Sequence, residues 1–146
     1  VMMLHGEMNA FSKSDMQQIL RKIHIALDSD GLLLLPASTV NGIKPKHLIR
    51  RTWESHTSGL FSDVPYLELD EDIWDPDTKT RIERYFIVSS VTGEVSEYSS
   101  AYQAYTNAEY RRLLTNSGFT DVKFLPPLYG MEKHSFCAVT LLGRKG

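Results

Sequence analysis

Apolar residues along the first 36 positions are spaced in a way that predicts a strand, a helix and a second strand. Val1 to Leu4 is a short apolar run typical of a buried strand. Apolar residues at helical spacing follow, at Met16, Ile19, Leu20, Ile23 and Leu27. Leu32 to Leu35 is again continuously apolar, as in strands buried on both faces of a parallel sheet. We therefore expect a right-handed βαβ unit over residues 1–36.

Two helix starts carry capping signals. Ser14 is followed three residues later by Gln17, and Thr106 by Glu109, so both pairs fit the capping-box pattern. Gly118 lies where a glycine would end the second helix, because a glycine readily adopts the left-handed conformation that such ends need. These signals predict one helix beginning after Ser14 and another beginning after Thr106.

The middle of the chain has a weaker pattern. Residues 36–80 are irregular, with a helix expected over residues 45–53 and an ordered loop over residues 58–77. The segments at residues 81–89 and 95–105 alternate and flank a Thr92-Gly93 turn, which predicts an antiparallel hairpin.

The end of the chain predicts two further strands, Thr120 to Leu125 and Ser135 to Leu142. The short connection between them, residues 126–134, has no room for a crossover helix, so the two strands should be antiparallel. Cys137 lies within the last strand and is expected to be buried and inert.

Composition narrows the class of protein. The 146 residues are 42% apolar and 23% charged, which fits one globular domain or a large piece of one. A net charge of −2 gives no basic footprint for nucleic acid, and the apolar runs are too short to span a membrane. A single cysteine and no visible signal peptide suit the cytoplasm.

Local charge runs have ordinary explanations. The cations at Lys44, Lys46, Arg50 and Arg51 are expected on a solvated helix face. The acidic run from Asp70 to Asp77 lacks the central glycine and distal glutamate of an EF-hand, so a solvated loop is expected there.

Three segments, in this order, carry a family resemblance: ALDSDGLLLLPAS, AYTNAEYRRLLTNSGFTDVKFLP and FCAVTLLGRK. The chain resembles the C-terminal half of a class I S-adenosylmethionine-dependent methyltransferase. Asp30 replaces the first glycine of the family's L-x-x-G-G segment. The resemblance implies an α/β fold with a partial Rossmann-like sheet, which begins with a parallel βαβ unit and ends in an antiparallel strand pair.

The resemblance also implies an organisation in three parts. Residues 1–36 would form the βαβ unit, residues 37–105 a substrate-covering insertion with the antiparallel hairpin, and residues 106–146 a helix and the last two core strands. The family's glycine-rich cofactor turn is not found after any strand of this sequence. We therefore expect further residues upstream of Val1.

Ligands of open α/β sheets bind beyond the carboxyl ends of the strands, which draws attention to the loop after the first strand. The resemblance implies that Gly6, Glu7, Asn9 and Phe11 bind S-adenosyl-L-methionine, and that His5 or Glu7 acts as a general base. Other interpretations stay open. Gly6 could only shape a turn, Asn9 could only cap a helix, and the alternating His5, Glu7 and Asn9 could hold a divalent metal, although a surface turn without metal is favoured.

Aromatic residues concentrate in the insertion. Trp74, Tyr98 and Tyr102 are the candidates for contact with substrate, since aromatic faces attract cations and line apolar pockets. Arg81 could hold a carboxylate of the substrate by paired hydrogen bonds. The competing interpretation is that these rings only pack a lid onto the sheet and that Arg81 lies on an ordinary strand surface.

The expected function is S-adenosylmethionine-dependent methyl transfer to a small-molecule acceptor, with this chain supplying the substrate side. The chain alone is expected to be inactive. The alternative is a non-catalytic α/β module for protein association, in which an exposed sheet edge pairs with a second copy to give a homodimer.

Overall fold

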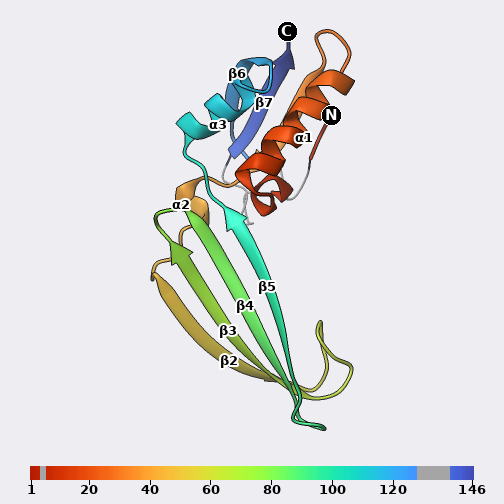
Figure 1. Ribbon diagram of the computed structural model, residues 1–146, viewed down its shortest axis with the longest axis vertical. Helices are drawn as coiled ribbons and strands as arrows, with labels where there is room; N and C mark the ends of the chain where they lie inside the picture. The colour runs from red at the N-terminus through yellow and green to blue at the C-terminus, as the bar shows by residue number, and fades with distance from the viewer. Residues whose placement is uncertain (4–5, 128–138) are drawn as a thin grey trace. The chain divides into compact units, whose positions relative to one another are not determined.

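The computed structural model describes residues 1–3, 6–127 and 139–146. The chain divides into two compact units (Figure 1). The core unit comprises Val1–Lys44 and Tyr102–Gly146, and the inserted unit comprises Pro45–Ala101.

The core unit is built on a sheet of three named strands, in the order β1 (Leu32–Ala37), β7 (Val139–Lys145) and β6 (Phe119–Leu125). Both neighbouring pairs are antiparallel. The first residues of the chain add a parallel partner on the other side of β1, where Met2 pairs with Leu34. The expected strand–helix–strand start and the antiparallel last pair are therefore confirmed, although residues 135–138 of the predicted last strand lie outside the described residues.

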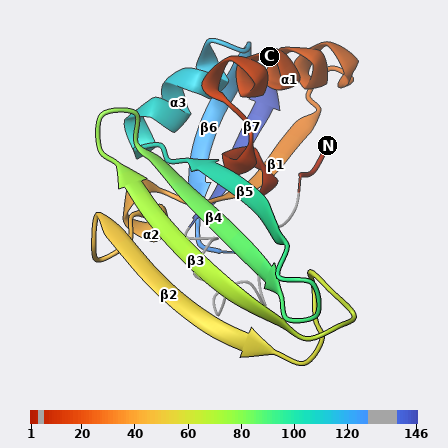
Figure 2. The ribbon, with the colours of Figure 1, turned by 60° about the horizontal axis from the view of Figure 1, so that its bottom comes forward.

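Helices α1 (Lys13–Ala26) and α3 (Asn107–Thr115) run next to each other over the core sheet (Figures 1 and 2). Two shorter helical segments, η1 (Glu7–Ala10) and α2 (Val40–Ile43), follow the strand ends. The apolar sides of the two long helices pack against the strands of the core sheet. The buried residues form one hydrophobic cluster, which includes Met16, Leu20, Leu33, Leu35, Tyr110, Leu114 and Leu141. Among the described residues, no helix has the length and apolar character needed to cross a bilayer.

Of the two helix caps predicted from sequence, one is confirmed and one is wrong. Thr106 and Glu109 form the complete capping box at the start of α3, as predicted. Gly118, just beyond that helix, has a φ of 101°, the left-handed conformation that its position suggested. The prediction of Ser14 as the cap of α1 is wrong, because the Ser12 hydroxyl accepts the Asp15 N–H at 3.1 Å and Ser14 already lies within the helix.

The inserted unit contains a four-stranded sheet in the order β2 (Ile49–His56), β3 (Tyr66–Asp75), β4 (Thr80–Ser89) and β5 (Val95–Gln103), whose last residues belong to the core unit. The predicted hairpin corresponds to β4 and β5, with Gly93 at a φ of 75° in the turn between them.

Two predictions for the inserted unit are wrong. The segment expected to be a helix over residues 45–53 contains the start of β2, and the expected loop over residues 58–77 contains β3. Strand β2 is an edge strand with nearly every residue exposed, so its sequence lacks the alternation that marks a strand. The four cations from Lys44 to Arg51 are exposed as expected, but Arg50 and Arg51 stand on a strand.

The acidic run is also not a solvated loop. Asp70 and Asp72 lie on β3, and Asp72 is only 6% exposed. Its carboxylate accepts two hydrogen bonds from the Arg81 guanidinium, at 2.8 and 3.0 Å. Burial of this carboxylate is tolerated because its charge is paired with good geometry.

The turn between α1 and β1 explains the residues at the family's double-glycine position. Asp30 has a φ of 62°, a conformation that costs most residues roughly 1–2 kcal/mol and that aspartate tolerates better than most. At Gly31 a Cβ atom would lie 2.8 Å from the backbone oxygen of Asp28. The first position therefore needs a left-handed backbone, and the second needs the absence of a side chain.

We predict that Asp30→Gly raises the free energy of unfolding by up to about 1 kcal/mol, because glycine removes the left-handed strain. Gly31→Ala should lower it by about 1–3 kcal/mol, because the new methyl group meets backbone that cannot give way. Urea denaturation of the two variants measures both effects. If Asp30→Gly were destabilising, the exposed Asp30–Arg144 pair at 3.5 Å would outweigh the strain.

Candidate functional site

The loop after the first strand presents some of its side chains outward and some inward. Gly6 has a φ of 73° and a ψ of 15°, and it begins the η1 turn without a side-chain cap. Glu7 is exposed and Phe11 is 37% exposed, whereas Met8 and Asn9 are buried. Glu7 and Phe11 are therefore open to a ligand. His5 lies outside the described residues.

Asn9 holds this loop to three distant segments. Its side-chain oxygen accepts the Ser38 N–H at 3.0 Å, and its amide nitrogen donates to the backbone oxygens of Ser38 at 3.2 Å and Gln103 at 2.8 Å. The same nitrogen donates to the Tyr110 hydroxyl at 2.8 Å. The side chain does not cap a helix, and its hydrogen-bonding groups are directed to the protein itself.

The Asn9 contacts lie at the edge where ligands of such sheets usually bind. Because residues 1–3 and β1 are parallel, the loop at Gly6 and the turn at Ser38 leave the sheet at the same edge. The segment before α3 joins them, since the Val40 N–H donates to the Tyr105 carbonyl at 3.1 Å. We call this arrangement of Asn9, Ser38, Gln103 and Tyr110 the Asn9 hub.

Two buried tyrosines, whose rings pack against each other at a tilt of 40°, lie beside the hub. Tyr110 donates its hydroxyl to the Ser38 carbonyl at 2.6 Å, and its ring lies 4.9 Å from the ring of Tyr105. Burial, and to a lesser extent the charge of Glu109, raises the pKa of Tyr105 to about 12. The Tyr105 phenol is therefore a neutral hydrogen-bond donor in the physiological range.

The inserted unit contains a separate aromatic pocket of about 280 Å³, lined by Leu60, Phe61, Glu68, Tyr85, Tyr98, Ser99 and Ser100. The ring of Phe61 lies 5.6 Å from that of Tyr85 and 5.1 Å from that of Tyr98. Burial and the adjacent Asp70 raise the pKa of Glu68, while His56 at 3.1 Å opposes that shift. Aromatic faces beside a carboxylate are suited to an organic cation.

The four residues predicted to contact substrate have different environments. Tyr98 is 47% exposed and lines the aromatic pocket, whereas Trp74 is buried at 5% exposure. Arg81 is paired with Asp72 and with Glu83 at 2.8 Å, so its charge is already balanced within the sheet. Tyr102 is half-buried in the core unit.

Sequence reasoning missed Glu68, the pocket's carboxylate. The signal was present as a two-residue alternation along β3, which places on one face Tyr66, Glu68, Asp70, Asp72 and Trp74. Acidic residues are rare on the buried face of a strand, so this alternation did not stand out. In the described ranges, no group of three or more His, Cys, Asp or Glu side chains is arranged to hold a metal ion.

Comparison with known proteins identifies the fold. No family model and no curated protein sequence matches the chain, but solved structures do. The CcbJ methyltransferase of Streptomyces caelestis matches with a TM-score of 0.66 and 12% identity, over 100% of this chain and 60% of that one. The sugar N-methyltransferase KedS8 of Streptoalloteichus matches with a TM-score of 0.63 and 12% identity, over 99% and 55%.

A third match is CalS10, an amino pentose methyltransferase of Micromonospora echinaspora, with a TM-score of 0.57 and 10% identity, over 100% of this chain and 57% of that one. The present chain thus has the fold of part of a class I methyltransferase, and the resemblance stated from sequence is confirmed at that level. It spans 55% to 60% of the length of these three structures.

We predict that Asn9→Ala lowers the free energy of unfolding by about 2–4 kcal/mol, because it removes the hydrogen bonds of the Asn9 side chain to the Ser38 N–H and the Gln103 carbonyl. Asn41→Ala, an exposed control in α2, should change it by less than about 0.5 kcal/mol. Chemical denaturation followed by circular dichroism compares the two. A loss under about 1 kcal/mol for Asn9→Ala would mean that water replaces the amide and that the hub is not structural.

Proposed function

We propose that this chain forms the acceptor-side part of an S-adenosyl-L-methionine-dependent methyltransferase that acts on a small molecule. The observation that carries this proposal is the loop at Gly6 to Phe11, which Asn9 fixes at the carboxyl edge of the parallel strands. Ligands of open α/β sheets bind at that edge. The shared fold supports the same conclusion, and the activity itself is to be tested on the intact protein.

The exposed residues of the loop suit the cofactor. Gly6 has no side chain and a left-handed backbone, so a ligand can approach the main chain closely there. Glu7 and Phe11 offer a carboxylate and an aromatic face beside it. When bound, S-adenosyl-L-methionine would supply an activated methyl group. Asn9 would act as a positioning residue, because its own amide is engaged with the protein.

A general base is needed only if the acceptor must lose a proton. Of the two candidates from sequence, Glu7 is the exposed carboxylate of this loop, and His5 lies outside the described residues. The principal contribution of the chain would be orientation of the acceptor, which can account for much of the rate of a group-transfer reaction.

We further infer that the acceptor carries an amine. The aromatic pocket combines the rings of Phe61, Tyr85 and Tyr98 with the carboxylate of Glu68, and such a surface favours a protonated amine over a neutral hydroxyl. KedS8 is a sugar N-methyltransferase and CalS10 an amino pentose methyltransferase, which agrees with this choice. An amine must be deprotonated before its nitrogen can accept a methyl group, so the reaction should slow at acidic pH.

We predict that Gly6→Ala weakens binding of S-adenosylhomocysteine to the intact protein by about tenfold, because the left-handed strain displaces the loop. Gly93→Ala is the matched control, since Gly93 has a φ of 75° and nothing within 4 Å of its missing Cβ. Both variants should lose about 1 kcal/mol of stability, but only Gly6→Ala should lose affinity in isothermal titration. Absence of binding by the intact wild-type protein would refute the proposed function.

We predict that Tyr98→Ala raises the KM for an amino sugar about fivefold to tenfold, because it removes one aromatic face from the pocket. Val95→Ala, an exposed control on the same strand, should leave KM unchanged. The assay follows transfer of a labelled methyl group to amino sugars and to their hydroxyl-only counterparts. Equal transfer to both kinds of sugar would rule out the amine while leaving the methyltransferase assignment intact.

A further inference from the structure

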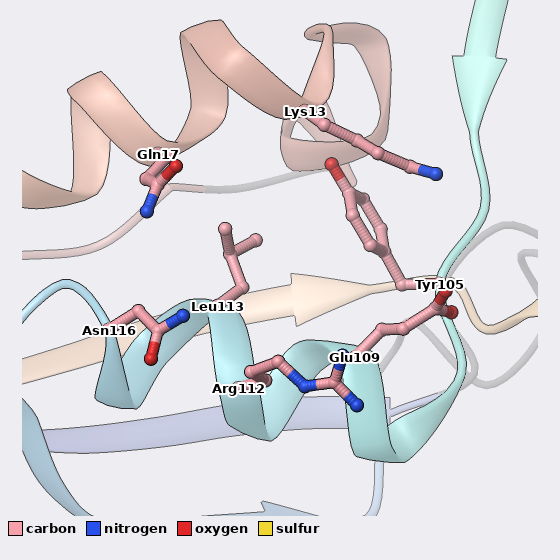
Figure 3. Close-up of a pocket in the computed structure, with 7 residues that line it drawn as sticks. All are labelled: Lys13, Gln17, Tyr105, Glu109, Arg112, Leu113 and Asn116. Atoms are coloured by element: carbon pink, nitrogen blue, oxygen red, sulfur yellow. The ribbon is translucent and has the colours of Figure 1, made fainter.

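A second cavity of about 250 Å³ lies in the core unit, in the groove between α1 and α3 (Figure 3). Lys13 and Gln17 line it from α1, one helical turn apart. The other side is provided by Tyr105, which precedes α3, by Glu109, Arg112 and Leu113 of that helix, and by its C-cap residue Asn116. This α1–α3 groove contains neither the exposed residues of the Gly6 loop nor any residue of the aromatic pocket.

The Tyr105 hydroxyl is the unexplained group of this groove. The residue is only 3% exposed, and its hydroxyl has no hydrogen-bond partner within residues 1–3, 6–127 and 139–146. Figure 3 shows the hydroxyl pointing toward the start of α1, on the side where the Lys13 side chain extends. A buried hydroxyl without a partner is unfavourable, and buried tyrosines usually find one.

The hydroxyl remains a donor over the whole physiological range, because burial raises the pKa of Tyr105 to about 12. Among the described residues, this donor has no acceptor. Phenylalanine would supply the same ring for packing against Tyr110 without the unpaired group. Packing alone does not account for a tyrosine here.

The charges around the groove favour an anion. Neither Lys13 nor Arg112 has an ion-pair partner in the described part of the chain. The one carboxylate of the groove, Glu109, accepts hydrogen bonds from the backbone and hydroxyl of Thr106 at 2.8 and 2.9 Å. The residues that line the cavity therefore include two cations and one carboxylate, which keeps its charge while it caps α3, so the cations are in excess by one.

We propose that the α1–α3 groove binds a compact organic anion, whose carboxylate or phosphate oxygen accepts a hydrogen bond from the Tyr105 hydroxyl and pairs with Lys13. Leu113 and the tyrosine ring provide an apolar surface for the carbon part of the ligand. A volume of about 250 Å³ suits a small molecule and not a nucleotide. Arg112 adds a second cation at the border of the same cavity.

The test uses three probes with the intact protein at constant ionic strength: benzoate, inorganic phosphate and the neutral benzyl alcohol. Protein NMR titration reports the affinity and the residues that shift. We expect benzoate or phosphate to shift resonances of the groove, and benzyl alcohol to bind at least tenfold more weakly than the better anion. A stronger response to benzoate identifies a carboxylate ligand, and a stronger response to phosphate identifies a phosphorylated one.

Two variants locate the anion. Tyr105→Phe and Lys13→Gln should each weaken binding of the better anion about tenfold, the loss typical of one hydrogen bond or pairing to a charged group. Lys22→Gln, an exposed control on the same helix, should have no effect beyond twofold. Unchanged binding in Tyr105→Phe, or equal losses in the Lys13 and Lys22 variants, would reduce the effect to general surface charge and overturn the proposal.

The unliganded protein supplies an independent check. Tyr105→Phe should have a Tm equal to or above that of the wild type, because it removes a buried hydroxyl that has no partner. A clearly lower Tm would show that the hydroxyl is already paired in the free protein, and the proposal would fail. These measurements involve no methyl donor, so their result is independent of the proposed methyltransferase activity.

Discussion

The side chain of Asn9 is the interaction on which the rest of the core unit depends. It joins residues 9, 38, 103 and 110, which are brought together only by the complete fold. An asparagine suits this position because its amide both accepts and donates, whereas a carboxylate could only accept. The Gly6 loop, the end of β1 and the segment leading into α3 therefore share one polar centre. In a buried network of this kind each bond strengthens its neighbours, so loss of one member weakens the others.

The inserted unit is organised by a different kind of interaction, a network of ion pairs. Its sheet buries an ion-pair network in which Arg81 contacts Asp72 and Glu83, and the Glu83 carboxylate also accepts the Tyr85 hydroxyl at 3.0 Å. Such a network is weak evidence for stability, because desolvation of the charges offsets much of their attraction. It does place Tyr85 beside Phe61, and thus shapes one wall of the aromatic pocket. Arg81, expected from sequence to hold a substrate, is paired with carboxylates of its own sheet, and its role toward a substrate stays a prediction.

The difference between the two units also explains what the sequence could predict. The core unit follows local rules, with a continuous apolar run in β1, helical spacing in α1 and a complete capping box at Thr106, so its elements were predictable. Strands β2 and β3 pair with their neighbours in sequence, but their charged faces hide the two-residue period. The contacts of Asn9 within the fold could not be predicted, because nothing local indicates that Ser38 and Gln103 lie beside it. Glu68 was missed because a carboxylate on a strand is usually solvated.

Tyr105 and Tyr110 form one pair of packed rings, but their hydroxyl groups differ in their hydrogen bonds. The two residues are both buried and their rings lie 4.9 Å apart, so the same packing and the same dielectric surroundings act on both. The Tyr110 hydroxyl has two partners, Asn9 and Ser38, and its presence is explained by the hub. The Tyr105 hydroxyl has no partner among the described residues, although phenylalanine would fill the same space. A group that costs stability and adds nothing to packing is best explained by something that it binds, and the cations beside it favour an anion.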